Sequence, residues 1–151
     1  MATNTQTTAD TEVLLDDWQA GVVGGIAGAA VMAVLVSVMN AAVLNGAIPG
    51  LYGLSGGIAG WTVHLSHGAV LGVVFAALVR SIGRGSTGRT VGLGIAWGAV
   101  TWVGLAALVM PLWLRAVGFP QAPPFPNFAV PSLLWHVVYG GVLGVAYAVL
   151  R

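Results

Sequence analysis

Four long apolar stretches are the feature of this sequence that most restricts its fold. They cover roughly residues 20–43, 57–79, 91–113 and 131–150. Each is long enough to cross a hydrocarbon core of roughly 30 Å as a helix, which takes about 20 residues. Only 6% of the residues are charged, whereas a soluble domain carries about 25%. The sequence therefore predicts an all-α, polytopic membrane four-helix bundle.

The four stretches use most of the 151 residues, so no separate soluble domain is expected. We predict a mobile N-terminal tail over residues 1–19, which is Thr-rich, and a single transmembrane domain over residues 20–151. The tail holds all four acidic residues, which are Asp10, Glu12, Asp16 and Asp17. The first stretch exceeds the apolar part of a signal peptide, about 7–15 residues, and is therefore expected to be a retained helix.

The arginines predict how the protein lies in the cell membrane. Arg80, Arg84 and Arg89 lie between the second and third stretches, and Arg151 follows the fourth. Because cytoplasmic loops are enriched in basic residues, both termini are expected in the cytoplasm. The connections over residues 45–56 and 115–131 then face outward. The second is rich in proline and phenylalanine, so it should be stiff, with rings at the headgroup level or against a protein partner.

The stretches resemble one another in pairs, which predicts a tandem repeat of a two-helix unit. Residues 24–28 (GGIAG) are similar to residues 94–98 (GIAWG), and residues 64–72 (HLSHGAVLG) to residues 136–144 (HVVYGGVLG). The offsets are 70 (94 minus 24) and 72 (136 minus 64). Repeat one then covers about residues 20–80 and repeat two about residues 90–151. Because each unit crosses the membrane twice, a pseudo-twofold axis along the membrane normal should relate the copies.

Each stretch also carries two glycines four residues apart. Helices in lipid associate through the close backbone contacts that small residues permit. These glycines are therefore predicted to mark the helix-packing faces; they are Gly24, Gly28, Gly68, Gly72, Gly94, Gly98, Gly140 and Gly144.

A layer of polar side chains is predicted inside the bundle. His64 and His136 each lie four residues before the first glycine of their stretch, and therefore on the same helix face. At about 1.5 Å per residue they lie at similar depth, toward the outer face. His67 and Tyr139 form a second matched pair nearer the centre, and Asn40 lies in the outer half of the first stretch. Ionisable groups in a membrane are costly, so this layer is where function is expected.

Three explanations fit this layer. Neutral histidines can fix the helix register by hydrogen bonding to neighbouring carbonyl or hydroxyl groups. His64 and His136 are candidate axial ligands of haem b, because imidazole is a common haem ligand and the adjacent glycines leave room for a flat macrocycle. His67 and Tyr139 could instead form part of a quinone, proton or copper site. The sequence contains no cysteine, which excludes disulfides, iron–sulfur clusters and thiolate metal sites.

Pro111 interrupts the third stretch at a position that corresponds roughly to Asn40 in the first. Proline lacks a backbone N–H, so it is predicted to kink the helix and open a small cavity at the level of the histidines. A proline near a helix end can also be accommodated without a cavity. Both outcomes remain open.

No catalytic motif is present. The sequence lacks a Gly-x-Ser-x-Gly elbow, a phosphate-binding loop and a His-Glu-x-x-His pair, and no acid lies in the apolar stretches. The net charge of +1 gives no electrostatic support for binding nucleic acid. We therefore expect a protein that is neither an enzyme nor a nucleic-acid-binding protein.

The chain has no lysine, five arginines, an acidic Thr-rich tail and a repeated His-x-x-[His/Tyr]-Gly-x-x-x-Gly motif. In these features it resembles an uncharacterised family of small four-span membrane proteins of halophilic archaea, some of them associated with respiratory oxidases. The resemblance implies a non-catalytic accessory subunit of a respiratory or electron-transfer complex, with protein partners in the membrane. The residues also allow a small oligomeric transporter or channel with a histidine-lined constriction, or a bis-histidine haem b carrier.

Overall fold

The computed structural model describes residues 15–83 and 85–151, and this part of the chain is all-helical. Four helical segments are long and apolar enough to cross a membrane: Asp17–Gly50, Gly57–Ser81, Thr87–Ala116 and Val130–Val149. The prediction of a multi-pass helical membrane protein is confirmed. Residues 1–14, with Asp10 and Glu12, lie outside the described residues, as does Arg84.

Two of the four segments are continuous α-helices, and two are built from several pieces. The continuous ones are α3 (Gly57–Ser81) and α6 (Val130–Val149). The first segment consists of α1 (Asp17–Ala42), the π-helical η1 (Val43–Ala47) and α2 (Ile48–Gly50). The third consists of α4 (Thr87–Thr101), the π-helical η2 (Trp102–Val109) and α5 (Met110–Ala116). Both π-helical stretches lie toward the same end of the bundle.

The first segment is longer than predicted. It begins at Asp17 and continues to Gly50, so the prediction of a loop over residues 45–56 is wrong for its first half. Asn45, Gly46 and Pro49 usually signal the end of a helix, but the first two lie within η1. Pro49 lies in the first turn of α2, where a backbone N–H is not needed. A kink occurs earlier, at Asn40, whose φ of −159° and ψ of 76° are not helical.

The third segment continues through Pro111. In an α-helix the carbonyl of Ala107 would accept a hydrogen bond from the N–H of residue 111, which proline lacks. The backbone N–H of Asn127 donates to this carbonyl instead, at 2.9 Å. The loop before α6 therefore satisfies the group that Pro111 leaves free, and the π-helical η2 lies directly before this point.

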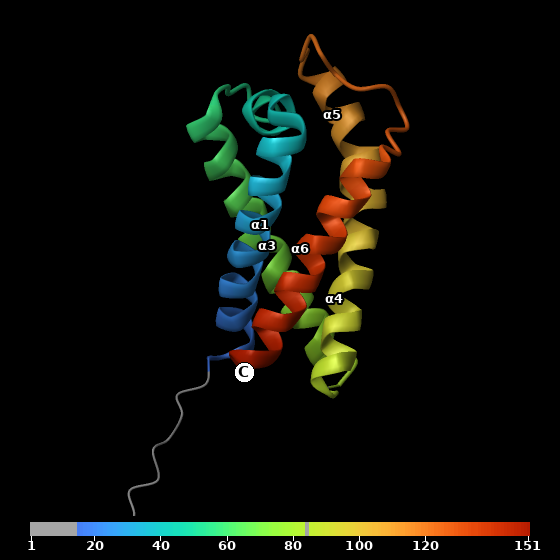
Figure 1. The fold of residues 1–151 in the computed structure, drawn as a ribbon. Coiled ribbons are helices and arrows are strands. Elements are labelled where there is room, and N and C mark those ends of the chain that lie inside the picture. Colours follow the sequence, from blue (N-terminus) through green and yellow to red (C-terminus); the bar gives the residue numbers. More distant parts are fainter. Residues whose placement is uncertain (1–14, 84) are drawn as a thin grey trace, which may run out of the picture.

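The helices form two pairs, α1 with α3 and α4 with α6, which are joined by the packing of α1 on α6. In contrast, α3 and α4 touch only slightly. The pairs lie close together where α1 begins and α6 ends, and they diverge toward the opposite end (Figure 1). We call these the terminal end and the loop end, the latter formed by residues 43–56 and 117–129. At the terminal end the Leu15 N–H donates to the Leu150 carbonyl at 2.9 Å.

Glycines permit the closest helix contacts, and all eight predicted packing glycines lie at such contacts. Within the first pair, a Cβ atom on Gly25 would collide with the carbonyl oxygen of Gly68. Within the second pair, a Cβ atom on Gly94 would collide in the same way with the carbonyl oxygen of Gly140. Each pair is thus held together by direct backbone contact, which side chains larger than hydrogen would prevent.

The glycines of α1 face two different helices. A Cβ atom on Gly28 would lie 2.7 Å from the carbonyl oxygen of Tyr139, and one on Gly24 would lie 3.1 Å from the Leu143 Cδ1. Both therefore face α6, whereas Gly25 faces α3. In its contacts Gly94 resembles Gly25, which is 69 residues before it (94 minus 25), rather than Gly24, with which the sequence comparison pairs it. The sequence could not distinguish these neighbouring glycines because each serves its own interface.

Candidate functional site

A cavity of about 1120 Å³ lies between the two helix pairs in the half of the bundle toward the loop end. The cavity exists because the two helix pairs diverge toward the loop end. Its lining reaches as far as Leu71 and Tyr139, and beyond them Phe75, Leu143 and Tyr147 are fully buried. Ligand pockets usually measure about 300–1,000 Å³, so this cavity is large enough for a sizeable organic molecule.

The five polar residues singled out from the sequence all line this cavity; they are Asn40, His64, His67, His136 and Tyr139. His64 is only 8% exposed. The structure therefore brings the predicted polar layer together on one surface. It does so with residues of α1, α3 and α6.

His64 and His136 both line the cavity, but their ring nitrogens differ in their surroundings. The Nδ1 of His136 lies 2.7 Å from the carbonyl oxygen of Ser132. Since a carbonyl only accepts, this nitrogen carries the hydrogen, and the Nε2 of a neutral ring then presents a lone pair. The Nε2 of His64 is buried and has no hydrogen-bond partner among the described residues. A buried polar atom without a partner is costly and suggests a ligand.

His67 and Tyr139 are engaged separately rather than with each other. The Tyr139 hydroxyl donates to the carbonyl oxygen of Gly68 at 3.1 Å, which ties α6 to α3 at the floor of the cavity. The His67 Nε2 is hydrogen bonded to the Tyr52 hydroxyl at 2.7 Å. Tyr52 is thus a site residue that the sequence did not reveal, because it lies in a connection with no motif and reaches His67 only through the fold.

Side chains at the loop end close the cavity from above. The Trp113 Nε1 donates to the carbonyl oxygen of Leu51 at 2.8 Å. The Phe119 ring lies directly against Gly50, where a Cβ atom would be 2.8 Å from its Cδ2. Since the backbones of α2 and α5 do not pack on each other, these two aromatic side chains form the bridge between the helix pairs there.

The threonine and serine hydroxyls near the histidines bond within their own helices. The hydroxyls of Thr62, Ser66 and Thr101 donate to carbonyl oxygens of their own helices, at 2.9, 2.8 and 2.9 Å. Two histidine hydrogen bonds of the kind that can fix helix position are present, from His136 to the Ser132 carbonyl and between His67 and the Tyr52 hydroxyl. In the described residues no group of three His, Asp or Glu side chains could hold a metal ion, so a bare copper ion would lack a third protein ligand.

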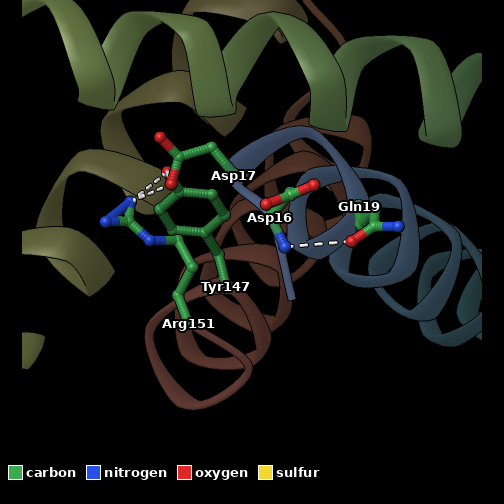
Figure 2. Close-up of polar contacts among 5 residues, drawn as sticks. All are labelled: Asp16, Asp17, Gln19, Tyr147 and Arg151. Carbon is green, nitrogen blue, oxygen red and sulfur yellow. Dashed lines mark hydrogen bonds and ion pairs between the residues drawn. The ribbon is translucent and has the colours of Figure 1, made fainter. Parts of the chain in front are cut away.

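A polar cluster closes the bundle at the terminal end (Figure 2). The Arg151 Nη1 lies 2.6 Å from the Asp17 Oδ1 and donates to the Tyr147 hydroxyl at 2.6 Å. The Tyr147 hydroxyl donates to the same carboxylate at 3.4 Å. The Arg151 and Asp17 side chains are 9% and 15% exposed. This cluster links α1 to α6 at the end opposite to the cavity.

Comparison with known proteins finds no match for this chain among protein-family models, curated proteins or solved structures. Its function must therefore be inferred from its own geometry. That geometry consists of a large cavity in the membrane-spanning region, three histidines on its wall and a sealed terminal end.

Proposed function

We propose that this protein is a non-catalytic accessory subunit of a respiratory or electron-transfer complex in the cell membrane, and that it holds haem b between His64 and His136. The observation that carries the proposal is the pair of imidazoles on one cavity. The Nε2 of His64 is buried without a partner, and the Ser132 carbonyl fixes His136 so that its Nε2 is free to bind.

The surroundings of the two histidines suit a haem. Haem-ligating histidines commonly donate their second ring N–H to a carbonyl or carboxylate, which orients the ring, and the Ser132 carbonyl has this role for His136. Two axial histidines suffice for a haem, because the macrocycle supplies the other four ligands of the iron. A bound haem would carry one electron at a time.

The two helix pairs are proposed to be copies of one unit. The matching contacts of Gly25 with Gly68 and of Gly94 with Gly140 support this. Phe75 and Tyr147 are 72 residues apart (147 minus 75), and their rings meet edge to face at 5.5 Å. Repeat-related residues that touch are expected near a twofold axis. Such an axis would also place His64 and His136 at one level on opposite sides.

The terminal end is proposed to face the cytoplasm. Arg80, Arg89 and Arg151 all belong to this end, where α3 ends, α4 begins and α6 ends. The positive-inside rule favours this orientation. The cavity would then lie toward the outer half of the bilayer, and the loop end would be available to partner subunits.

Purification of the protein from its native membrane in mild detergent tests this function. We expect a Soret band in its spectrum, and mass spectrometry should identify oxidase or cytochrome subunits in the same preparation. The His64→Ala variant should lose the band, whereas Thr62→Val should keep it, since Thr62 bonds only to its own helix. A colourless wild-type protein that purifies only as a homo-oligomer would contradict the proposal.

A further inference from the structure

One mouth of the cavity faces the lipid. Val70 on α3 and Leu105 and Val109 on η2 line the cavity and are 63%, 43% and 52% exposed. Because α3 and η2 scarcely pack on each other, these residues form the edges of a side opening. A molecule dissolved in the bilayer could enter there without passing through water.

The opposite side of the cavity is closed. There α1 packs on α6, and the Trp135 Nε1 donates to the Met39 Sδ at 3.0 Å across the two helices. The cavity-lining residues Met32, Val36 and Trp135 are buried. Lateral access is therefore expected through the mouth between α3 and η2.

The cavity wall favours a neutral ligand head. None of the described residues that line the cavity carries a charge. A phosphate or carboxylate head would lack a counter-charge, and burying an unpaired charge is very costly. The wall does provide aromatic rings, from Tyr52, Trp113 and Phe119, against which a flat ring packs well. These features fit a neutral, flat head better than the head of a phospholipid or a fatty acid.

His67 and Tyr52 provide hydrogen bonding on the α3 side of this space. When Tyr52 donates to the Nε2 of His67, the His67 Nδ1 carries the hydrogen and can donate to a carbonyl oxygen. The Tyr52 oxygen can in turn accept a hydrogen bond from a hydroxyl group. A quinone offers a carbonyl oxygen and a hydroquinone offers a hydroxyl, so this pair matches both forms.

We propose that the cavity binds the head of a membrane-dissolved quinone, which enters between α3 and η2 and is held by His67 and Tyr52. This inference extends the proposed electron-transfer function, because a quinone is a mobile partner with which a bound redox group could exchange electrons. It uses residues other than the haem ligands. The two proposals can therefore fail independently.

Binding of a benzoquinone with a ten-carbon tail to the purified protein, measured by calorimetry in detergent, tests the proposal. We expect saturable binding of one molecule per chain. His67→Leu should weaken it about tenfold, which corresponds to roughly 1.4 kcal/mol, and Tyr52→Phe should weaken it less. Ser66→Ala is the matched control on α3, since its hydroxyl bonds only to the Thr62 carbonyl, and it should bind like the wild type. Absence of saturable binding, or equal binding by folded His67→Leu, would overturn the proposal.

Competing ligands and the haem variants separate the possible outcomes. Hexadecanol and oleate should displace the quinone poorly, and equally tight binding of either would contradict a quinone site. His64→Ala and His136→Ala should lose the Soret band, whereas His67→Leu should keep it. If the wild-type protein contains no haem but binds quinone in a way that depends on His67, this inference is supported and the haem proposal is refuted. A wild-type protein that shows a Soret band but binds no quinone would support the haem proposal and refute this inference.

Discussion

The seam between α1 and α6 and the seam between α4 and α3 would be equivalent if the two helix pairs were identical copies, yet only the first is closed. Gly24 and Gly28 line the closed seam. With an offset of 69, Leu93 and Trp97 stand at the corresponding positions of α4 (93 minus 24 and 97 minus 28). Both are partly buried against the core. The α4 positions that an offset of 69 pairs with these glycines therefore carry large side chains.

This difference agrees with the weak packing of α4 on α3. Glycines let two helix backbones approach closely, whereas leucine and tryptophan keep them apart. The resulting asymmetry leaves a space beside α3 and exposes its edge to lipid. A perfectly symmetric bundle with glycine in both seams would close on itself and leave little room around the histidines.

The largest effect is expected when the glycines of the closed α1–α6 seam are replaced by the side chains at the corresponding positions of α4. In Gly24→Leu/Gly28→Trp, the new atoms would meet Leu143 and Tyr139. Overpacking costs about 1–3 kcal/mol per site, so we expect a loss of about 2–6 kcal/mol in unfolding free energy, measured by denaturation in mixed micelles. Gly92→Leu/Gly104→Trp is the control, because nothing lies within 4 Å of either glycine. Wild-type stability of the first variant would refute the assignment of this seam.

Loss of the terminal cluster should have the next largest effect. Arg151→Gln removes the ion pair with Asp17 that links α1 to α6 at the terminal end. Hydrogen bonds to charged groups contribute roughly 1.5–3 kcal/mol, so unfolding free energy should fall by about 2 kcal/mol. Arg89→Gln is an exposed control that bonds to loop carbonyls. Equal losses for the two variants would show that the cluster has no particular role.

The reverse exchange should narrow the mouth of the cavity. In Leu93→Gly/Trp97→Gly, α4 can approach α3 as α1 approaches α6. The natural chain contains no cysteine, so Val70→Cys introduces a single thiol at the mouth. Its reaction with a lipid-soluble maleimide should be several-fold slower in the glycine background. An unchanged rate would contradict the view that Leu93 and Trp97 hold the seam open.

The smallest effect is expected at the upper part of the closed seam. Trp135→Phe keeps an aromatic ring but removes the hydrogen bond to Met39. We expect a loss of about 0.5–1 kcal/mol in unfolding free energy. Trp113→Phe is a useful comparison, because its hydrogen bond to Leu51 spans the cavity roof instead. A loss of unfolding free energy larger than that of Arg151→Gln would show that this hydrogen bond stabilises the seam more than the terminal cluster does.

Apolar length was sufficient to predict four membrane-spanning helices, and helical spacing was sufficient to predict that His64 and His136 line one polar layer. The helical turns over Asn45–Gly50 were missed because Asn45, Gly46 and Pro49 usually end a helix. In the structure Asn45 and Gly46 lie in the π-helical η1, and Pro49 lies in the first turn of α2. Tyr52 was missed because a loop residue acquires its partner only through tertiary structure. The glycine register was displaced because neighbouring glycines of α1 face different helices.

The most direct test of the central claim is a titration of the haem-free protein with haem b, followed by absorption spectroscopy. The account predicts one haem per chain with a six-coordinate, low-spin spectrum. Either His64→Ala or His136→Ala should convert it to a five-coordinate form or abolish binding, and His67→Leu should leave it unchanged. A wild-type protein that binds no haem, or whose spectrum is the same in both alanine variants, would contradict the account.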